Sequence, residues 1–595
     1  MTSTTDPRSE YLRRIDERRA NSARLMQRFR KIGFIRLAAL AIGLILLSFS
    51  VFAGLSAWWL ALPAALFLVL GRVQARITEA RLRCERAARL YEQGLARLDD
   101  RWAGTGATGD RFNDPAHPYA EDLDLFGHGS LFELLSIART DTGEETLARW
   151  LSGPASIDDV RARQEAVTEL RPKLDLREDL ALLGEGVPSG ESARGLDAWA
   201  NGPYWNISPW IRPTAIVVSL LTIATLILWF AGFSPAPFVL VLIIRQVFSY
   251  SLRGPVERVI SEVDGPGNNL SLLSDILKRL EHERYKSALL IELRAALDVA
   301  GSPASKQIAR LNLLVELLDS RRNFIFAPLA AILLWPLQCA ISIERWRQKS
   351  GPGVGRWLAA VGELEALSSL ACYAYEHPHD PFPELMASRG HFEATAMGHP
   401  LIPEPRNVRA DLRLGGKPDV LIVSGSNMSG KSTLLRTAGI NVVLALAGAP
   451  VRAKNLRLSP LQVGASIRIQ DSLQAGASRF YAEIKRLRLI VELTSGERPV
   501  LFLLDEILHG TNSHDRQIGA EKVVHGLIER GAIGLITTHD LALARIADEL
   551  GPRAANVHFE DHLEDGQMRF DYRLRPGVVQ HSNALELMRS VGLDV

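Results

Sequence analysis

One short stretch of the chain has the spacing of a phosphate-binding loop. Residues 425–433 read Gly-Ser-Asn-Met-Ser-Gly-Lys-Ser-Thr and contain the pattern G-x-x-x-x-G-K-[ST]. In such a loop, backbone N–H groups and a helix N-terminus bind phosphate oxygens, and the lysine reaches the β- and γ-phosphates. The pattern therefore predicts ATP binding, with the hydroxyl of Ser432 as a Mg²⁺ ligand. The predicted binding residues are Gly425, Ser426, Asn427, Met428, Ser429, Gly430, Lys431, Ser432 and Thr433.

Two acids and a histidine follow apolar segments further along the chain. The segment from Pro499 ends in Asp505 and Glu506, which suit water-mediated Mg²⁺ binding and activation of the attacking water, respectively. An acid pair after a strand is common, so its position downstream of a phosphate loop carries the argument. His539 ends another apolar segment, where it can donate to the γ-phosphate. An isolated histidine is more often structural, so this role depends on the other motifs.

Ser478 stands where a helix is expected to begin. Four apolar residues follow it at helical spacing, and we expect them to form the buried face: Phe480, Ile484, Leu487 and Val491. In ATPases of the ABC type, a serine in this position reaches the γ-phosphate bound to the opposing subunit. An ordinary helix N-cap also favours serine, and the two interpretations are compatible.

These residues need a parallel sheet and helices to hold them. Residues 420–423 form a short β-branched run typical of a buried strand, and 433–446 show helical spacing. We expect an α/β P-loop domain at 391–574, followed by a helical tail at 575–595. The region 121–390 is expected to be mostly helical, with long leucine-rich helices at 267–320 and 355–376.

The N-terminal region contains a long apolar run. Residues 37–71 are long enough for two crossings of a bilayer with a tight turn near Gly54, and basic residues flank both ends. A transmembrane hairpin is predicted, with a basic cytosolic lead at 1–36 and a charged helical connector at 72–120. The alternative is a buried hairpin of a soluble protein, although the run lacks the polar face that this would require.

Two more apolar segments follow. Residues 214–246 are predicted to form a second transmembrane hairpin, again with basic flanks. Residues 324–343 are broken by Pro328 and Pro336, and a core helix of a large α-domain explains them better than a membrane span.

Composition limits the class of protein without identifying it. At 595 residues the chain exceeds a single core, and its net charge of +2 excludes a globally basic nucleic-acid binder. Its three cysteines are scattered, which argues against structural zinc and a disulfide framework and fits a reducing compartment.

Taken together, three motifs resemble the ATPase domain of the MutS family of DNA mismatch repair proteins. They are Ser424–Thr433, Leu504–Asn512 and Thr537–His539. Met428 and the Gly510-Thr511 pair distinguish them from general ABC transporters. Upstream, the resemblance extends to Trp150-Leu151, Arg163–Val167, Leu364–Ala371 and Gly398–Ile402.

The resemblance implies a fold, a mechanism and partners. The fold is an ABC-type MutS ATPase domain preceded by a helical core and lever domain. ATP and Mg²⁺ would bind in a homodimer with two composite sites: Ser478 of one protomer completes the site of the other, Glu506 activates water, and His539 senses the γ-phosphate. Residues 575–595 would help the dimer form, and DNA is the family's ligand.

The sequence also departs from the family. Ser426, Arg479, His509 and Asp540 replace residues usual in the family, and none of these changes removes a phosphate or Mg²⁺ ligand. Residues 1–120 carry the apolar hairpin in place of a mismatch-binding domain with its Phe-x-Glu wedge. We therefore expect a multi-pass, membrane-anchored MutS-like ATPase with a cytoplasmic ATPase domain that couples ATP hydrolysis to DNA binding. The alternative is a membrane-bound switch that acts on a protein partner without DNA, and an exporter is the least favoured.

Overall fold

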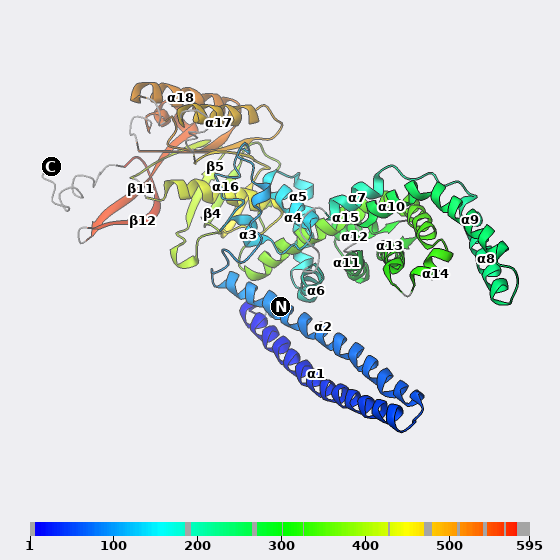
Figure 1. The fold of residues 1–595 in the computed structure, drawn as a ribbon. Coiled ribbons are helices and arrows are strands. Elements are labelled where there is room, and N and C mark those ends of the chain that lie inside the picture. Colours follow the sequence, from blue (N-terminus) through cyan, green and yellow to red (C-terminus); the bar gives the residue numbers. More distant parts are fainter. Residues whose placement is uncertain are drawn as a thin grey trace. The chain divides into compact units, whose positions relative to one another are not determined.

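Two long helices pack as a hairpin in the first of the two units of the chain, Met1–Gly106 (Figure 1). Its elements are α1 (Pro7–Phe52), η1 (Ala57–Leu60) and α2 (Ala61–Leu98). The structure, a computed structural model, describes residues 6–184, 192–264, 270–299, 301–324, 326–426, 429–468, 479–508, 512–539, 544–564 and 567–579.

The polar ends of this hairpin pair with each other. Arg14 donates to the Tyr91 hydroxyl at 2.9 Å, and Arg19 forms a 2.7 Å ion pair with Glu92. The rings of Tyr11 and Tyr91 lie 5.4 Å apart. The basic N-terminal lead and the charged segment after the apolar run are thus two sides of one antiparallel helical stalk.

The half of the hairpin near its turn is apolar and exposed. Phe52 and Trp58 are 86% and 85% exposed, respectively. At the border with the polar half, Arg36 donates to the Gln74 side chain at 3.0 Å. Within the described residues, three helical stretches are long and apolar enough to cross a bilayer by length and composition: Pro7–Phe52, Trp58–Leu98 and Ile211–Phe230.

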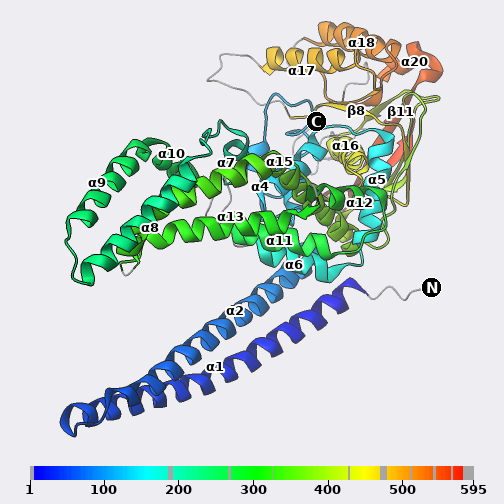
Figure 2. The ribbon, with the colours of Figure 1, turned by 90° about the vertical axis from the view of Figure 1, so that its right-hand side faces the viewer.

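The second unit, Ala107–Val595, begins with a helical part (Figures 1 and 2). Its helices are η2 (Asp110–Phe112), α3 (Leu131–Leu135), α4 (Asp141–Ser152), α5 (Ile157–Leu170), α6 (Leu174–Gly184), α7 (Ser192–Asn201), α8 (Ile211–Phe230), α9 (Ala236–Ser251), α10 (Arg253–Asp264), α11 (Leu270–His282), α12 (Ala288–Ala296), α13 (Ala304–Asp319), η4 (Ser320–Arg322), α14 (Ala327–Ile332) and α15 (Trp335–Glu376). Two short strands, β1 (Asp298–Val299) and β2 (Ser302–Pro303), pair between α12 and α13.

The 42-residue helix α15 is the spine of this part. It contacts α8 and α14 and packs along α13, α7, α5 and α4. Just beyond its C-terminal end, Asp380 accepts a hydrogen bond at 3.1 Å from Arg452, a residue of the ATPase part. A single helix therefore runs from the apolar pair α8–α9 to the ATPase part.

The contact between α4 and α15 is unusually close. A Cβ atom at Gly143 would lie 2.2 Å from Glu365 Oε2, and one at Gly362 would lie 2.6 Å from the carbonyl oxygen of Thr142. The Glu365 side chain is buried and accepts hydrogen bonds from the N–H of Thr140 at 3.2 Å and its hydroxyl at 2.5 Å. The N-terminus of α4 is therefore fixed to the middle of α15.

Helices α8 and α9 lie side by side and form the second apolar pair (Figure 2). Helix α9 is long and apolar enough to cross a bilayer only together with α10, from which it is bent by 58°. The segment 324–343 is interrupted between α14 and α15, where Leu334 has a left-handed φ of 50°. Its second part is buried, from Leu337 to Ile343, as expected for a core helix.

The ATPase part contains two sheets. The larger sheet has the order β12-β11-β6-β10-β9-β8, parallel except for β12, and the smaller has the order β3-β7-β4-β5. The strands are β3 (Glu384–Leu385), β4 (Phe392–Met397), β5 (Ala410–Leu414), β6 (Val420–Ser424), β7 (Asn455–Leu458), β8 (Gln462–Ser466), β9 (Val500–Asp505), β10 (Ile533–Thr538), β11 (Ala554–Glu564) and β12 (Gln567–Pro576). The helices are η5 (Glu404–Arg406), α16 (Lys431–Ala447), α17 (Arg479–Leu493), α18 (Ser513–Glu529), α20 (Ile546–Leu550) and η6 (Gly551–Arg553).

Helices cover both faces of the larger sheet. Helices α17 and α18 lie on one face and α16 on the other (Figure 1). A strand buried on both sides must be apolar throughout, and β6 and β9 meet this requirement. Helix α17 buries Leu487 as predicted, but the prediction is wrong at Ile484, which is 41% exposed, because Glu483 and Ile490 turn inward instead.

Candidate active site

The ends of three parallel strands bring the predicted residues together. Strand β6 ends at Ser424, opposite Thr538 of β10, and Thr537 lies opposite Asp505 at the end of β9. Because ligands bind at the carboxyl ends of parallel strands, a nucleotide is expected at this end of the sheet. The register therefore places the phosphate loop, the acid pair and His539 at one edge of the sheet.

The phosphate loop wraps around its lysine. Lys431 is buried, and its Nζ donates to the carbonyl oxygens of Gly425 at 2.8 Å and Ser426 at 2.9 Å. Gly430 adopts a φ of 100°, which only glycine accepts without strain, and it leads directly into α16. Asn427 and Met428 lie outside the described residues.

Two hydroxyls of the loop fit a phosphate ligand. The side-chain oxygens of Ser426 and Ser429 are buried and have no hydrogen-bond partner among the described residues. Buried polar groups are normally satisfied, and phosphate oxygens are strong acceptors. Ser432 and Thr433 follow at the N-terminus of α16, where a helix favours anions. The loop therefore suits a nucleotide phosphate chain.

The acid pair is held by Thr537 of the neighbouring strand. The hydroxyl of Thr537 donates to Asp505 Oδ1 and accepts a 3.1 Å hydrogen bond from the backbone N–H of Glu506. Glu506 adopts a φ of 49°, in the left-handed region, which is uncommon for a residue other than glycine. This turn aims the Glu506 carboxylate toward Lys431, whose Nζ is 3.8 Å away.

His539 contacts the same carboxylate oxygen as Lys431. Its Nδ1 is 3.3 Å from Glu506 Oε1. Burial lowers the pKa of Lys431, while the carboxylates of Glu506 and Asp505 oppose that shift. Lys431, Glu506 and His539 therefore form one cluster, with Asp505 beside it.

The cavity at this end of the sheet is lined by the predicted motif residues and also by residues outside the motifs. It measures about 1140 Å³ and is lined by Lys431, Ser432, Thr433, Asp505 and Glu506. Its other walls include His399, Leu401, Ile402, Pro403, Phe559 and Tyr572. Burial lowers the pKa of His399 to about 4, so this ring is neutral and suits an uncharged group. Gly398–Ile402 resembles the family in sequence, but nothing in its pattern indicates that it lines the site.

Ser478 lies outside the described residues, and so do Gly510 and Thr511. The described residues on either side of the Ser478 segment are the end of β8 with Ile467 and Arg468, and the start of α17 at Arg479. Glu483 of α17 accepts a hydrogen bond from the backbone N–H of Leu508. The helix after Ser478 is therefore attached to the turn that carries Glu506.

The fold and the site define a P-loop ATPase domain, with the phosphate loop between β6 and α16 and the acids at the end of β9. The family model of MutS domain V matches residues 421–594. The C-terminal domain is thus a MutS domain V, an ABC-type ATP hydrolase domain, and the chain is similar to the MutS family through this domain. Such a domain binds ATP, and Mg²⁺ is general for ATPases of this type.

Curated relatives agree with this assignment. The chain is 32% identical over 249 residues to Endonuclease MutS2 of Thermus thermophilus, which covers 40% of this chain and 31% of the relative. It is 32% identical over 269 residues to DNA mismatch repair protein MSH6 of Arabidopsis thaliana, covering 42% and 20%. It is 34% identical over 249 residues to DNA mismatch repair protein MutS 2 of Halobacterium salinarum, which covers 40% of this chain and 27% of the relative. The chain thus spans less than a third of the length of these relatives.

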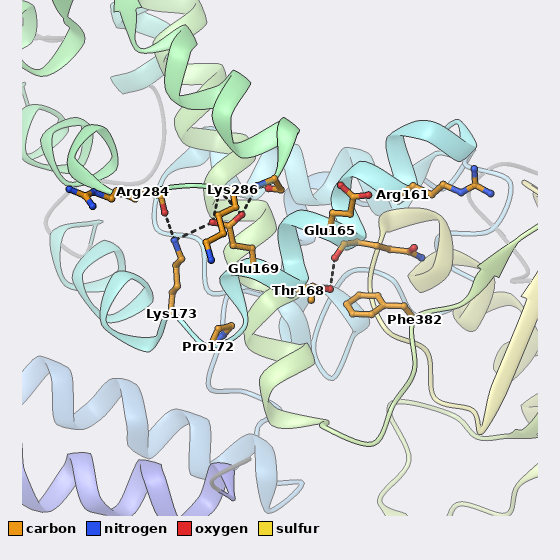
Figure 3. Close-up of a pocket in the computed structure, with 11 residues that line it drawn as sticks. Arg161, Glu165, Thr168, Glu169, Pro172, Lys173, Arg284, Lys286 and Phe382 are labelled. Atoms are coloured by element: carbon orange, nitrogen blue, oxygen red, sulfur yellow. Dashed lines mark hydrogen bonds and ion pairs between the residues drawn. The ribbon is translucent and has the colours of Figure 1, made fainter. Parts of the chain in front are cut away.

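A second hollow lies between α5, the start of α12 and Phe382 (Figure 3). It measures about 860 Å³ and includes Arg161, Lys173, Arg284 and Lys286. Arg161 and Arg284 point toward opposite ends of the view, so these cations do not converge on one point. Lys173 forms ion pairs with Glu169 and Glu283, at 3.4 and 3.0 Å respectively. The contacts in this hollow hold α5 against the segment before α12.

One group of side chains outside the ATP site has metal-ligand chemistry. The ligand atoms of Glu521, His525 and Glu549 lie within 4.8 Å of one another. Glu549 is exposed, and exposed carboxylates often gather without an ion, so we assign no role to the group.

Proposed function

We propose that this chain hydrolyses ATP in a composite site formed by two copies of its ATPase domain, and that it does so while anchored to a membrane. The observation that carries the proposal is the cluster at the carboxyl ends of the strands, where Lys431 and His539 both contact Oε1 of Glu506. A carboxylate beside a phosphate loop is placed to orient or deprotonate an attacking water.

Each residue of the site then has a separate task. Gly425–Thr433 binds the phosphates, and Ser432 and Asp505 would hold Mg²⁺, which supplies charge neutralisation of the phosphates. Thr537 keeps Asp505 and the backbone of Glu506 in position. His539 would sense the γ-phosphate, and its contact with Glu506 supports this role. Ser478 of the second copy completes the site, as the family resemblance implies.

The membrane part of the proposal rests on exposed apolar helices. The hairpin α1–α2 and helix α8 are long enough to span, and much of their apolar surface is exposed. Large exposed apolar surfaces in a protein mark contact with a partner or a membrane. We place the chain in the cell membrane as a multi-pass protein, with the ATPase domain in the cytoplasm.

An alkaline carbonate wash of cell membranes is expected to leave the full-length chain in the pellet, because spanning helices are held by their apolar surface and not by charge. The measurement is the fraction of the chain in pellet and supernatant after centrifugation. The Lys431→Ala variant serves as a control, since it alters the ATP site and none of the apolar helices. Release of most of the chain into the supernatant would contradict the spans.

Helix α15 provides a route for coupling. It contacts α8 of the apolar pair near one end and leads to the ATPase part at the other. A rigid helix can transmit a change at the ATP site over its length as a rigid-body movement. The output is proposed to be DNA binding, as the names of the relatives suggest, or action on a protein partner at the membrane.

The basic stretch Arg345–Lys349 of α15 is a candidate for DNA contact, but only part of it is exposed. Arg347 is buried, stacks on Trp199 at 5.1 Å and pairs with Glu262 at 3.3 Å, so it is part of the helical core. Arg345 and Lys349 remain exposed on α15. These two residues are therefore the better candidates for a phosphate contact.

If DNA is the output, duplex DNA is expected to stimulate ATP hydrolysis by the detergent-purified chain. Phosphate contacts make such binding salt-sensitive, so the stimulation should decline as salt is raised. Double substitution of Arg345 and Lys349 by Gln should weaken it, while the control Arg530→Gln, an exposed residue at the end of α18, should not. The absence of both stimulation and salt-sensitive binding, with matched and mismatched duplexes, would favour the protein-partner function.

A further inference from the structure

A segment just before the helical part is built into the ATPase domain. Residues 117–126, which we call the strap, precede α3 by a few residues, far in sequence from any strand of the ATPase sheet. The carbonyl oxygen of Pro118 nevertheless accepts a 2.8 Å hydrogen bond from the N–H of Ala465 in β8. Tyr119, Asp122 and Leu125 are buried. The strap is therefore a structural part of the ATPase domain.

The buried carboxylate of Asp122 holds both flanks of the segment that carries Ser478. Its Oδ1 accepts hydrogen bonds from the backbone N–H groups of Ile467 and Arg468, both at 2.7 Å. Its Oδ2 accepts from Arg486 of α17 at 3.1 Å. One side chain thus fixes the described residues before the segment to the helix after it.

Arg486 donates two hydrogen bonds to the strap. Its Nη1 donates to the carbonyl oxygen of His117 at 2.6 Å, while Nη2 reaches Asp122. One turn away on the same helix, Glu483 holds the backbone of Leu508, two residues beyond Glu506. The strap, α17 and the turn after the acid pair therefore form one connected set.

The other face of the strap rests on the helix that follows the phosphate loop. A Cβ atom at Gly439 of α16 would lie 2.7 Å from Leu123, so these two residues pack in direct contact. Asp124 forms ion pairs with Arg436 of α16 at 3.3 Å and with Arg468 at 2.5 Å. The strap thus contacts both the helix of the protein's own phosphate loop and the described residues that flank the Ser478 segment.

We propose that Asp122 is a positioning residue for the composite ATP site. It acts through Arg486 and the backbone of Ile467 and Arg468 on the segment that carries Ser478, the residue proposed to complete the ATP site of the other protomer. This inference rests on the proposed function, because it requires a dimer with composite sites. The strap, through Asp122, would therefore affect ATP hydrolysis in the partner protomer. Its contacts with α16 would affect the phosphate loop of its own protomer.

The first test is Asp122→Asn, which keeps the shape of the side chain and removes the charge that three donors share. A misplacement of about 1 Å at a reacting group reduces turnover by about 100-fold, and we expect a loss of this order in kcat. The affinity for ATP, measured with a fluorescent analogue, should remain unchanged because the phosphate loop is intact. Asp114→Asn is the matched control, since Asp114 is exposed and caps only the local backbone of Ala116.

Mixed dimers distinguish positioning in the partner from damage to the fold. Two affinity tags isolate dimers in which only one phosphate loop works, the other carrying Lys431→Ala. In the first dimer, Asp122→Asn sits on the chain with the working loop, and turnover should equal that of a wild-type/Lys431→Ala dimer. In the second, Asp122→Asn sits on the Lys431→Ala chain, and turnover should fall by about 100-fold.

The outcomes separate cleanly. A loss in the second dimer alone supports the inference. Equal losses in both dimers, a loss in the first alone, or a loss in neither would overturn it. A wild-type dimer without any ATP turnover would instead remove the proposed function, and this inference with it.

Discussion

Glu506→Gln protein is expected to bind ATP and to hydrolyse it at a rate reduced by a factor on the order of 10²–10⁴, the usual contribution of a general base. The substitution keeps the shape of the side chain and the backbone hydrogen bond to Thr537, while removing the carboxylate that Lys431 and His539 contact. Phosphate release under steady-state conditions measures the turnover, and filter binding of radiolabelled ATP measures the binding.

Lys431→Ala provides the comparison, because it should lose both binding and turnover. The lysine is the buried cation of the loop, and nothing else in the described part of Gly425–Thr433 supplies a positive side chain. Glu497→Gln, an exposed substitution outside the site, should behave as wild type. Hydrolysis at the wild-type rate by Glu506→Gln would refute the role assigned to Glu506.

The stability of the helical part is expected to depend on pH through Glu365. Burial raises the pKa of this carboxyl from 4.5 to about 7. Below about pH 4.5 the group is protonated in both the folded and unfolded chains, so it does not disfavour folding. As the pH rises from about 4.5 to about 7, the unfolded chain releases this proton while the folded chain retains it, so about 3 kcal/mol of stability is lost by pH 7.

Glu365→Gln should abolish this loss, because the amide oxygen can still accept hydrogen bonds from Thr140 and carries no charge. The difference in Tm between the variant and the wild type, measured in detergent, should therefore rise from pH 5 to pH 8. Glu497→Gln should leave the pH dependence of Tm unchanged. A Tm difference for Glu365→Gln that is the same at both pH values would rule out the buried charge as its cause.

Local sequence patterns were sufficient for the centre of the ATPase domain. Residues 420–423 were expected to form a strand and 433–446 a helix, and the structure has β6 and α16 there. Residues 420–423 are wholly apolar and residues 433–446 are mostly apolar, and the glycine-rich loop between them marks the boundary. A buried strand and a buried helix reveal themselves in this way because burial on all sides leaves no choice of residue type.

Other features depended on distant contacts and could not be read from spacing. Arg347 belongs to a basic stretch in the sequence, yet it is buried against Trp199 and Glu262. Ile484 was expected inside α17, and instead Glu483 turns inward to hold Leu508. In both cases a buried polar side chain contacts residues distant in sequence, which the pattern of the helix alone does not show.

The sequence by itself determined the chemistry of this protein, because a phosphate loop, an acid pair and apolar helices are local patterns set by residue type. Only the tertiary structure decided how these pieces are connected. The polar helices on both sides of the apolar run pair as one stalk, and Asp122 joins β8 to α17 across more than half the length of the chain. Such links depend on single hydrogen bonds between residues distant in sequence, and the periodicity of the sequence does not predict them.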